Sequence, residues 1–311
     1  VTPGFRFEYI KTQSEGEYKK INFDIAGNPI LNEDIADNRD FDRAFVLLGV
    51  GLSYKPVKSI EVYGNISQNY RSVTFNDIRI TNPSLVVDPN ITDEQGYTFD
   101  LGARGRFGKY LSYDIGGFYL SYQDRLGVIV REVSDIQEER FRGNIGDAVT
   151  YGLESFVDWN IMETFSANRN FRMNYFVNLA LTDSEYTSSE ENNVEGNKVE
   201  FIPAINLKTG LGFGYKNFLG SLQFTYLSKQ FTDATNSKRD FESQSGIVGE
   251  IPAYDILDLS LAYTFGRFKL ESGINNVLDN SYFTRRATGY PGPGILPSQP
   301  RTWYATLQIK I

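Results

Sequence analysis

The chain has 311 residues, a formal net charge of −8 and a mean hydropathy of −0.35, and it contains neither cysteine nor histidine. The absence of cysteine excludes disulfide frameworks and thiolate chemistry, and the absence of histidine excludes histidine acid–base relays and the commonest metal ligand. The acidic balance argues against nucleic acid as a partner, because nucleic-acid binding needs a basic face.

Apolar residues are interspersed with polar ones along the whole chain, although 41% of the residues are hydrophobic and 14% are aromatic. No apolar run approaches the roughly 18 to 20 residues that a membrane-spanning helix requires. A tilted membrane strand needs only about 9 to 11 residues. The composition therefore excludes spanning helices and leaves spanning strands open.

Taken in chain order, twelve stretches alternate apolar and polar side chains with a period of two, which predicts β-strands with one apolar and one polar face. The expected strands are residues 4–11, 43–54, 59–68, 97–107, 110–130, 147–161, 171–182, 205–215, 219–231, 256–264, 268–275 and 303–311. In the last of these, Trp303, Ala305 and Leu307 alternate with Tyr304 and Thr306. The sequence therefore predicts an all-β fold.

The connections between these strands alternate between short and long. Short ones are expected at 55–58, 107–109, 162–170, 216–217 and 265–267, and long polar ones at 12–41, 69–95, 131–146, 183–204, 232–252 and 277–301. This alternation is typical of a transmembrane antiparallel β-barrel with short periplasmic turns and long extracellular loops. Aromatic residues beside the short turns, such as Tyr54, Tyr215 and Phe265, indicate an interfacial girdle.

A barrel also needs a partner for each edge strand, because each unpaired backbone group in lipid costs several kcal/mol. Nothing in the sequence marks the first strand as the partner of the last. Since Val1 lies directly before a strand, we expect additional chain to complete the barrel.

Four segments carry a family resemblance: GINNVLDNSYF at 273–283, QPRTWY at 299–304, YTFDLGAR at 97–104 and GDAVTYGLE at 146–154. These segments resemble strand motifs of TonB-dependent outer-membrane transporters, and they occur along the chain in the same order as in that family. The adjacent Arg285 and Arg286 and the PGPG segment at 291–294 are most similar to the ferric citrate and ferric siderophore branch. Ile311 departs from the aromatic residue with which the family usually ends.

The resemblance implies that residues 1–311 are the C-terminal part of a plugged barrel, about the last twelve of its 22 strands. It implies a receptor in the outer membrane of a Gram-negative bacterium that takes up a ferric chelate, such as ferric citrate or a siderophore. Its partners would be outer-membrane lipid and lipopolysaccharide, the missing N-terminal part of the protein, and the TonB complex acting through the N-terminal plug. The family consists of transporters, so no enzyme activity and no cofactor are expected.

A vestibule for anionic, oxygen-rich chelates should present arginine for bidentate contacts and aromatic rings for stacking. The candidates in the expected extracellular loops are Arg285, Arg286, Arg71, Tyr70 and Tyr290. The alternative roles for these residues are loop packing and, for the arginines, solvation or contact with lipopolysaccharide phosphates.

Other features of the sequence say less about function. Arg140 and Arg142 flank a third, charged loop. The acidic loop at 183–200 lacks the spaced pattern of a calcium loop, so no metal site is expected. Alternating glycines at 210, 212 and 214 on the polar face should make room for a plug.

Three other functions stay open at this point. A TonB-dependent importer of a glycan or a peptide would share the fold and differ only in its loops. A self-contained twelve-stranded passive pore would close its own ring of strands. A soluble β-rich binding module is disfavoured by two-sided alternation on every strand.

Overall fold

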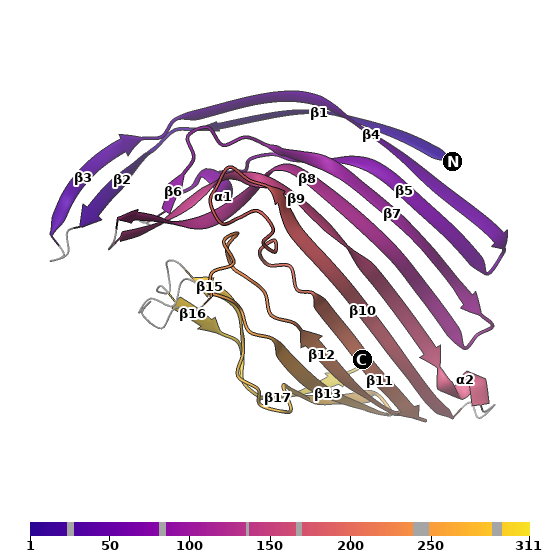
Figure 1. Cartoon of the computed structure of the whole chain (residues 1–311). Helices are drawn as coiled ribbons and strands as arrows, with labels where there is room; N and C mark the ends of the chain where they lie inside the picture. The colour runs from indigo at the N-terminus through magenta and orange to yellow at the C-terminus, as the bar shows by residue number, and fades with distance from the viewer. Residues whose placement is uncertain (24–27, 81–84, 135–136, 166–169, 239–248, 288–293) are drawn as a thin grey trace.

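The computed structural model describes residues 1–23, 28–80, 85–134, 137–165, 170–238, 249–287 and 294–311. The chain forms one large antiparallel sheet (Figure 1). Its twelve long strands are β1 (Thr2–Ser14), β4 (Arg39–Val57), β5 (Ile60–Arg71), β7 (Glu94–Phe107), β8 (Leu111–Ser134), β9 (Gln137–Asn160), β10 (Phe171–Ser188), β11 (Ile205–Tyr215), β12 (Phe218–Leu227), β13 (Tyr254–Phe265), β14 (Phe268–Asn275) and β17 (Thr302–Ile309). All twelve expected strands are confirmed.

Each long strand pairs with its neighbour in the chain, and the order runs from β1 to β17 without a crossover. Among the described residues β1 pairs with β4 and β17 with β14, so the sheet is curved but open (Figure 1). The described strands therefore do not close the ring that a self-contained pore would need.

The two faces of the sheet differ in chemistry. On β4, Val46, Leu48 and Val50 are 51%, 58% and 38% exposed, and they pair with outward-facing residues of β1 such as Phe5 and Phe7. The same face of every long strand carries large exposed apolar side chains, and we call it the outer face. Its opposite, the inner face, carries charged and polar side chains and is hollowed by cavities, of which two matter for function. An apolar outer face of this extent is stable in hydrocarbon and not in water.

Short turns join the strands at one end of the sheet, which we call the turn end. At the opposite loop end the connections are long and partly ordered: β2 (Glu17–Phe23) pairs with β3 (Pro29–Ala36), and β15 (Phe283–Ala287) pairs with β16 (Gly294–Pro297). One short helix, α1 (Phe75–Ile78), and the strand β6 (Leu85–Val87) lie in the β5–β7 connection, and α2 (Ile161–Phe165) lies at the turn end. No helix among the described residues has the length and apolar character to cross a membrane.

The buried core lies in the loops and not in the sheet. One cluster gathers Val73, Ile78, Leu85, Val87, Ile91 and Leu126, and a second gathers Ile129, Phe141, Ile145, Ala148, Tyr186, Val194, Val199 and Ala234. Both clusters stand at the loop end, where the connections meet water and need a core of their own.

Two expectations about the connections are wrong. The charged loop expected at Arg131–Arg142 is mostly strand, because β8 and β9 continue outward as a long hairpin to Ser134 and from Gln137. A register shift between Glu132 and Ser134 lies in this segment and interrupts the alternation that the sequence pattern relies on. The strand expected at 219–231 ends at Leu227.

Candidate functional site

The first candidate pair, Tyr70 and Arg71, lies at the loop end of β5. Arg71 contacts two carboxylates: its Nη2 lies 2.7 Å from Asp77 Oδ1 and its Nη1 lies 3.0 Å from Glu94 Oε1. The Tyr70 hydroxyl donates a hydrogen bond to Asp93. The charge of Arg71 is thus compensated within the protein.

Asp93 is the anchor of this connection. It accepts a bidentate pair from Arg43, at 2.5 and 2.8 Å, and the backbone N–H of Val73 at 2.7 Å. Burial and the hydrogen bond to Asp93 raise the pKa of Tyr70 above its ordinary value, so the phenol stays protonated. The Tyr70 ring packs against Phe45 with centroids 3.8 Å apart, which places this tyrosine in loop packing.

Helix α1 begins with a capping box. Asp77 accepts hydrogen bonds from the backbone N–H and the hydroxyl of Thr74 at 2.8 and 2.7 Å. Burial raises the pKa of Asp77, but the hydrogen bonds from Thr74 and the charge of Arg71 outweigh it, so the pKa lies below its ordinary value of 3.8. The carboxylate is therefore charged at neutral pH and ties Arg71 to the start of α1.

The second pair lies on β15 in the last long connection. Arg286 donates from Nη2 to the backbone carbonyl of Glu250 at 2.7 Å and lies over the Phe283 ring at 5.2 Å. Arg285 is exposed and makes no ion pair with any residue that the structure describes. Tyr290 falls outside the described residues.

Arg140 and Arg142 lie on the extended β8–β9 hairpin, next to β6. Arg142 donates to two backbone carbonyls of α1, Asn76 at 2.8 Å and Asp77 at 3.3 Å, and to no carboxylate in the described part of the chain. Burial, and then the neighbouring charge of Arg142, lower the pKa of Arg140 below its ordinary value. This crowding of half-buried cations was only weakly indicated by the sequence, which placed the two arginines in a loop.

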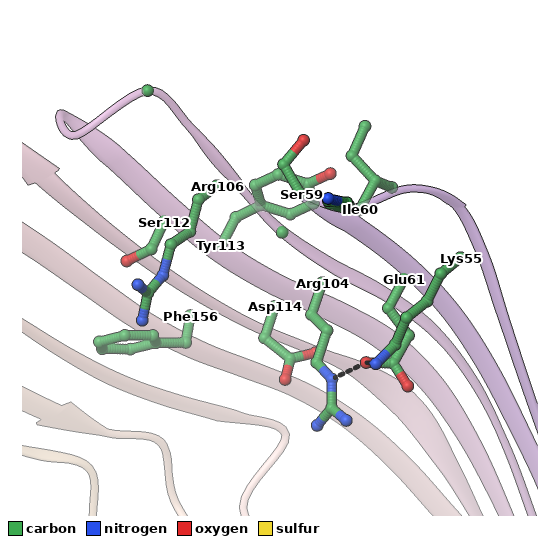
Figure 2. A pocket seen from close by; sticks show the side chains of 13 residues that line it. Lys55, Ser59, Ile60, Glu61, Arg104, Arg106, Ser112, Tyr113, Asp114 and Phe156 are labelled. Carbon is green, nitrogen blue, oxygen red and sulfur yellow. Dashed lines mark hydrogen bonds and ion pairs between the residues drawn. The ribbon is translucent and has the colours of Figure 1, made fainter.

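The inner face carries a separate cavity of about 780 Å³ near the turn end (Figure 2). Arg104 donates from Nε to Glu61 at 3.1 Å, and Lys55 lies 3.8 Å from the same carboxylate. Figure 2 shows Lys55, Glu61, Arg104 and Asp114 projecting to one side of the sheet. Sequence reasoning missed this cavity, because its residues come from strands whose pairing it did not establish.

A second cavity, of about 500 Å³, lies farther along the same face and contains Asp100, Asp114 and Glu154 with no lysine or arginine in its lining. Tyr63 lies in this wall and donates a hydrogen bond to Asp114 at 2.7 Å. Between these two cavities the lining thus changes from mainly basic at the turn end to acidic above it. No group of three or more acidic side chains in the described residues could hold a metal ion.

The alternating glycines of β11 do not leave open space. A Cβ on Gly210 would lie 2.5 Å from the Phe176 ring, and a Cβ on Gly212 would lie 2.3 Å from Asn174 Oδ1. The expectation that these glycines make room for a plug is corrected here, since side chains of the neighbouring β10 take up the space.

Comparisons with known proteins agree with this architecture. The chain is similar to the solved structures of the unliganded ferric citrate transporter FecA, with TM-score 0.70 and 23% identity, and of the ferric yersiniabactin uptake receptor FyuA from Yersinia pestis, with TM-score 0.71 and 18% identity. The copper transporter OprC matches with TM-score 0.71 and 15% identity. Each match covers 99% of this chain but only 42%, 42% and 45% of the other chain, so the chain spans less than half the length of these proteins.

A family model described as TonB dependent receptor-like, beta-barrel, matches residues 1–277. This match covers most of the chain and includes eleven of the twelve long strands. The chain therefore belongs to the TonB-dependent receptor β-barrel family, whose members are transporters and not enzymes.

Proposed function

We propose that residues 1–311 are the C-terminal part of the barrel of an outer-membrane receptor that takes up an anionic ferric chelate. The observation that carries the proposal is the pairing of an exposed apolar outer face with a polar, hollowed inner face. In this orientation the turn end is periplasmic and the loop end faces the medium, in contact with lipopolysaccharide.

The ligand class is supported by the arginines at the loop end. Arg285 has no counter-ion in the described part of the chain, and Arg142 forms hydrogen bonds to backbone carbonyls with the Asp77 carboxylate nearby but in no direct ion pair. Guanidinium groups that form no direct ion pair favour an anionic ligand, and they match the paired oxygens of citrate or of an iron chelate. Arg71 and Tyr70 are better suited to holding the loop, Arg286 to positioning β15, and Tyr290 stays a prediction.

Energised uptake requires more than this chain. The solved receptors FecA and FyuA are more than twice as long as the matched region, and the family has an N-terminal plug and interacts with TonB. We propose that the full-length protein has such a plug and uses the TonB complex in the same way.

The test is uptake of radiolabelled iron by cells that express the full-length receptor in a strain without other iron receptors. We expect uptake of ferric citrate or of a ferric siderophore, and we expect a protonophore to abolish it. Arg285→Glu should reduce uptake at least about tenfold, since the position loses an attraction and gains a repulsion.

The control is Arg79→Glu, which changes an exposed arginine after α1 by the same charge. Uptake that continues after the proton gradient is removed would point to a passive pore. Failure to take up any ferric chelate, with uptake of another nutrient, would favour the glycan or peptide alternative.

A further inference from the structure

The cavity at the turn end of the inner face has an excess of positive charge. Its lining contains four cations, Lys55, Lys58, Arg104 and Arg106, and two carboxylates, Glu61 and Asp114. Glu61 contacts both Arg104 and Lys55, and it also accepts a hydrogen bond from Ser53 at 2.7 Å. Glu61 thus compensates the charge of two of the four cations.

The remaining two cations are not compensated. Neither Lys58 nor Arg106 makes a side-chain hydrogen bond or an ion pair with any residue the structure describes, and both are exposed. Beside them, Phe156 is 42% exposed although it lies on the polar inner face (Figure 2). A cavity with free cations around an uncovered ring fits a segment that carries carboxylates and at least one apolar side chain.

The alternation of side chains along β7 determines on which side of the sheet the cavity lies. Arg104 and Arg106 alternate with Ala103, Gly105 and Phe107, and Phe107 lies on the outer face. The guanidinium groups therefore point away from the hydrocarbon, and lipid headgroups on the outer face cannot reach them. The occupant must come from inside the barrel.

We infer that this cavity docks an acidic segment of the N-terminal plug. The inference rests on the proposed function, which supplies a plug inside the barrel. The neighbouring cavity supports the assignment by contrast, since it shares Asp114, adds Asp100 and Glu154, contains no lysine or arginine in its lining and would repel the same segment. The change of sign along the inner face would fix the height and the orientation of the plug.

The test uses the full-length receptor in detergent and compares Lys58→Glu/Arg106→Glu with Lys109→Glu/Arg267→Glu. The control pair changes the charge equally at two exposed turn-end residues outside the cavity lining. Hydrogen exchange with mass spectrometry should show one plug segment rich in Asp or Glu losing protection about tenfold in the first variant only, because two ion pairs of ordinary strength are lost. Raising the salt concentration in the unsubstituted receptor should weaken protection of the same segment.

A plug variant with Lys in place of the acidic residues of that segment should restore protection to the cavity variant and lose protection by itself. Unchanged exchange throughout the N-terminal part, or equal changes in both variants, would overturn the inference. If proton-dependent iron uptake persists in that case, the proposed function stands and only the docking is refuted. If hydrogen exchange responds as expected while no ferric chelate is taken up, the docking of the plug segment is supported and the proposed ligand class is refuted.

Discussion

Substitution of Gly102 tests whether the inner wall is packed as the structure shows. A Cβ at Gly102 would lie 2.4 Å from both Cζ and the hydroxyl of Tyr63, whose ring crosses from β5 over β7. Alanine at this position must displace the ring. The displaced Tyr63 then cannot keep its 2.7 Å hydrogen bond to Asp114.

The magnitude follows from these two effects. A hydrogen bond to a charged group contributes about 1.5 to 3 kcal/mol, and forcing a side chain off its rotamer costs about 0.5 to 1.5 kcal/mol. We therefore expect Gly102→Ala to lower the free energy of unfolding by about 3 kcal/mol. Gly64→Ala is the matched control, since its Cβ would meet its nearest neighbours at 3.5 Å and 3.6 Å, an ordinary contact.

The assay is urea unfolding of the full-length receptor in detergent, followed by the shift between folded and unfolded bands on gels. A double-mutant cycle with Tyr63→Ala isolates the contact. If Gly102→Ala costs as much in the Tyr63→Ala background as in the unsubstituted protein, the ring is not what the alanine displaces. Equal costs for Gly102→Ala and Gly64→Ala would also refute the packing.

Three further predictions concern the two faces and the loop end. Leu48→Arg on the outer face should lower the free energy of unfolding by about 2 to 4 kcal/mol in lipid. Leu47→Arg on the inner face should lower it clearly less. Equal losses of stability in urea titrations would contradict the assignment of faces. Asp77 has a lowered pKa in the folded loop, so its stabilisation is present above its unfolded pKa and lost as the pH falls through the folded value. The protection of residues 72–80, measured relative to the intrinsic exchange rate at each pH, should therefore fall below about pH 4, and Asp77→Asn should remove this pH dependence. Asp93→Asn leaves Arg43 without its bidentate partner and should destabilise the loop by about 3 kcal/mol. The measurement is amide hydrogen exchange, which should become faster in 72–93 and stay unchanged in β12–β14.

The strands could be predicted from the sequence because lipid imposes a strict rule on them. Residues such as Leu257, Leu259 and Leu261 must share one face, and any slip of one residue would bring Asp258 into the hydrocarbon. The alternation therefore survives in the sequence wherever the strand crosses the membrane. It predicts the number and order of the long strands and the positions of the short turns.

The loop end could not be predicted in this way, because water accepts either face of a strand. The extension of β8 carries Val128 and Val130 on one side and Ile129 on the other, and both sides are covered by loops. The expected strand therefore stops at Val130, and the charged segment that follows was predicted as a loop although β8 continues to Ser134 and β9 begins at Gln137. The cluster of Arg140 and Arg142 depends on pairing with β6, which joins residues more than 50 positions apart.

The positions of the buried residues also explain why the two ends of the molecule should behave differently. The sheet buries no core of its own, since lipid and the inner contents of the barrel cover its faces, and its stability rests on the ladder of backbone hydrogen bonds. The loops stand in water and are held by two apolar clusters and by buried groups such as Tyr186, which donates to Glu200 at 2.7 Å. Urea acts on this water-facing core directly but reaches the ladder only after lipid or detergent is displaced, so the loop end should open first and without unfolding the sheet. A ligand that bridges Arg285 and the β8–β9 hairpin would therefore be detected as added stability of the loops alone, with the strands unaffected.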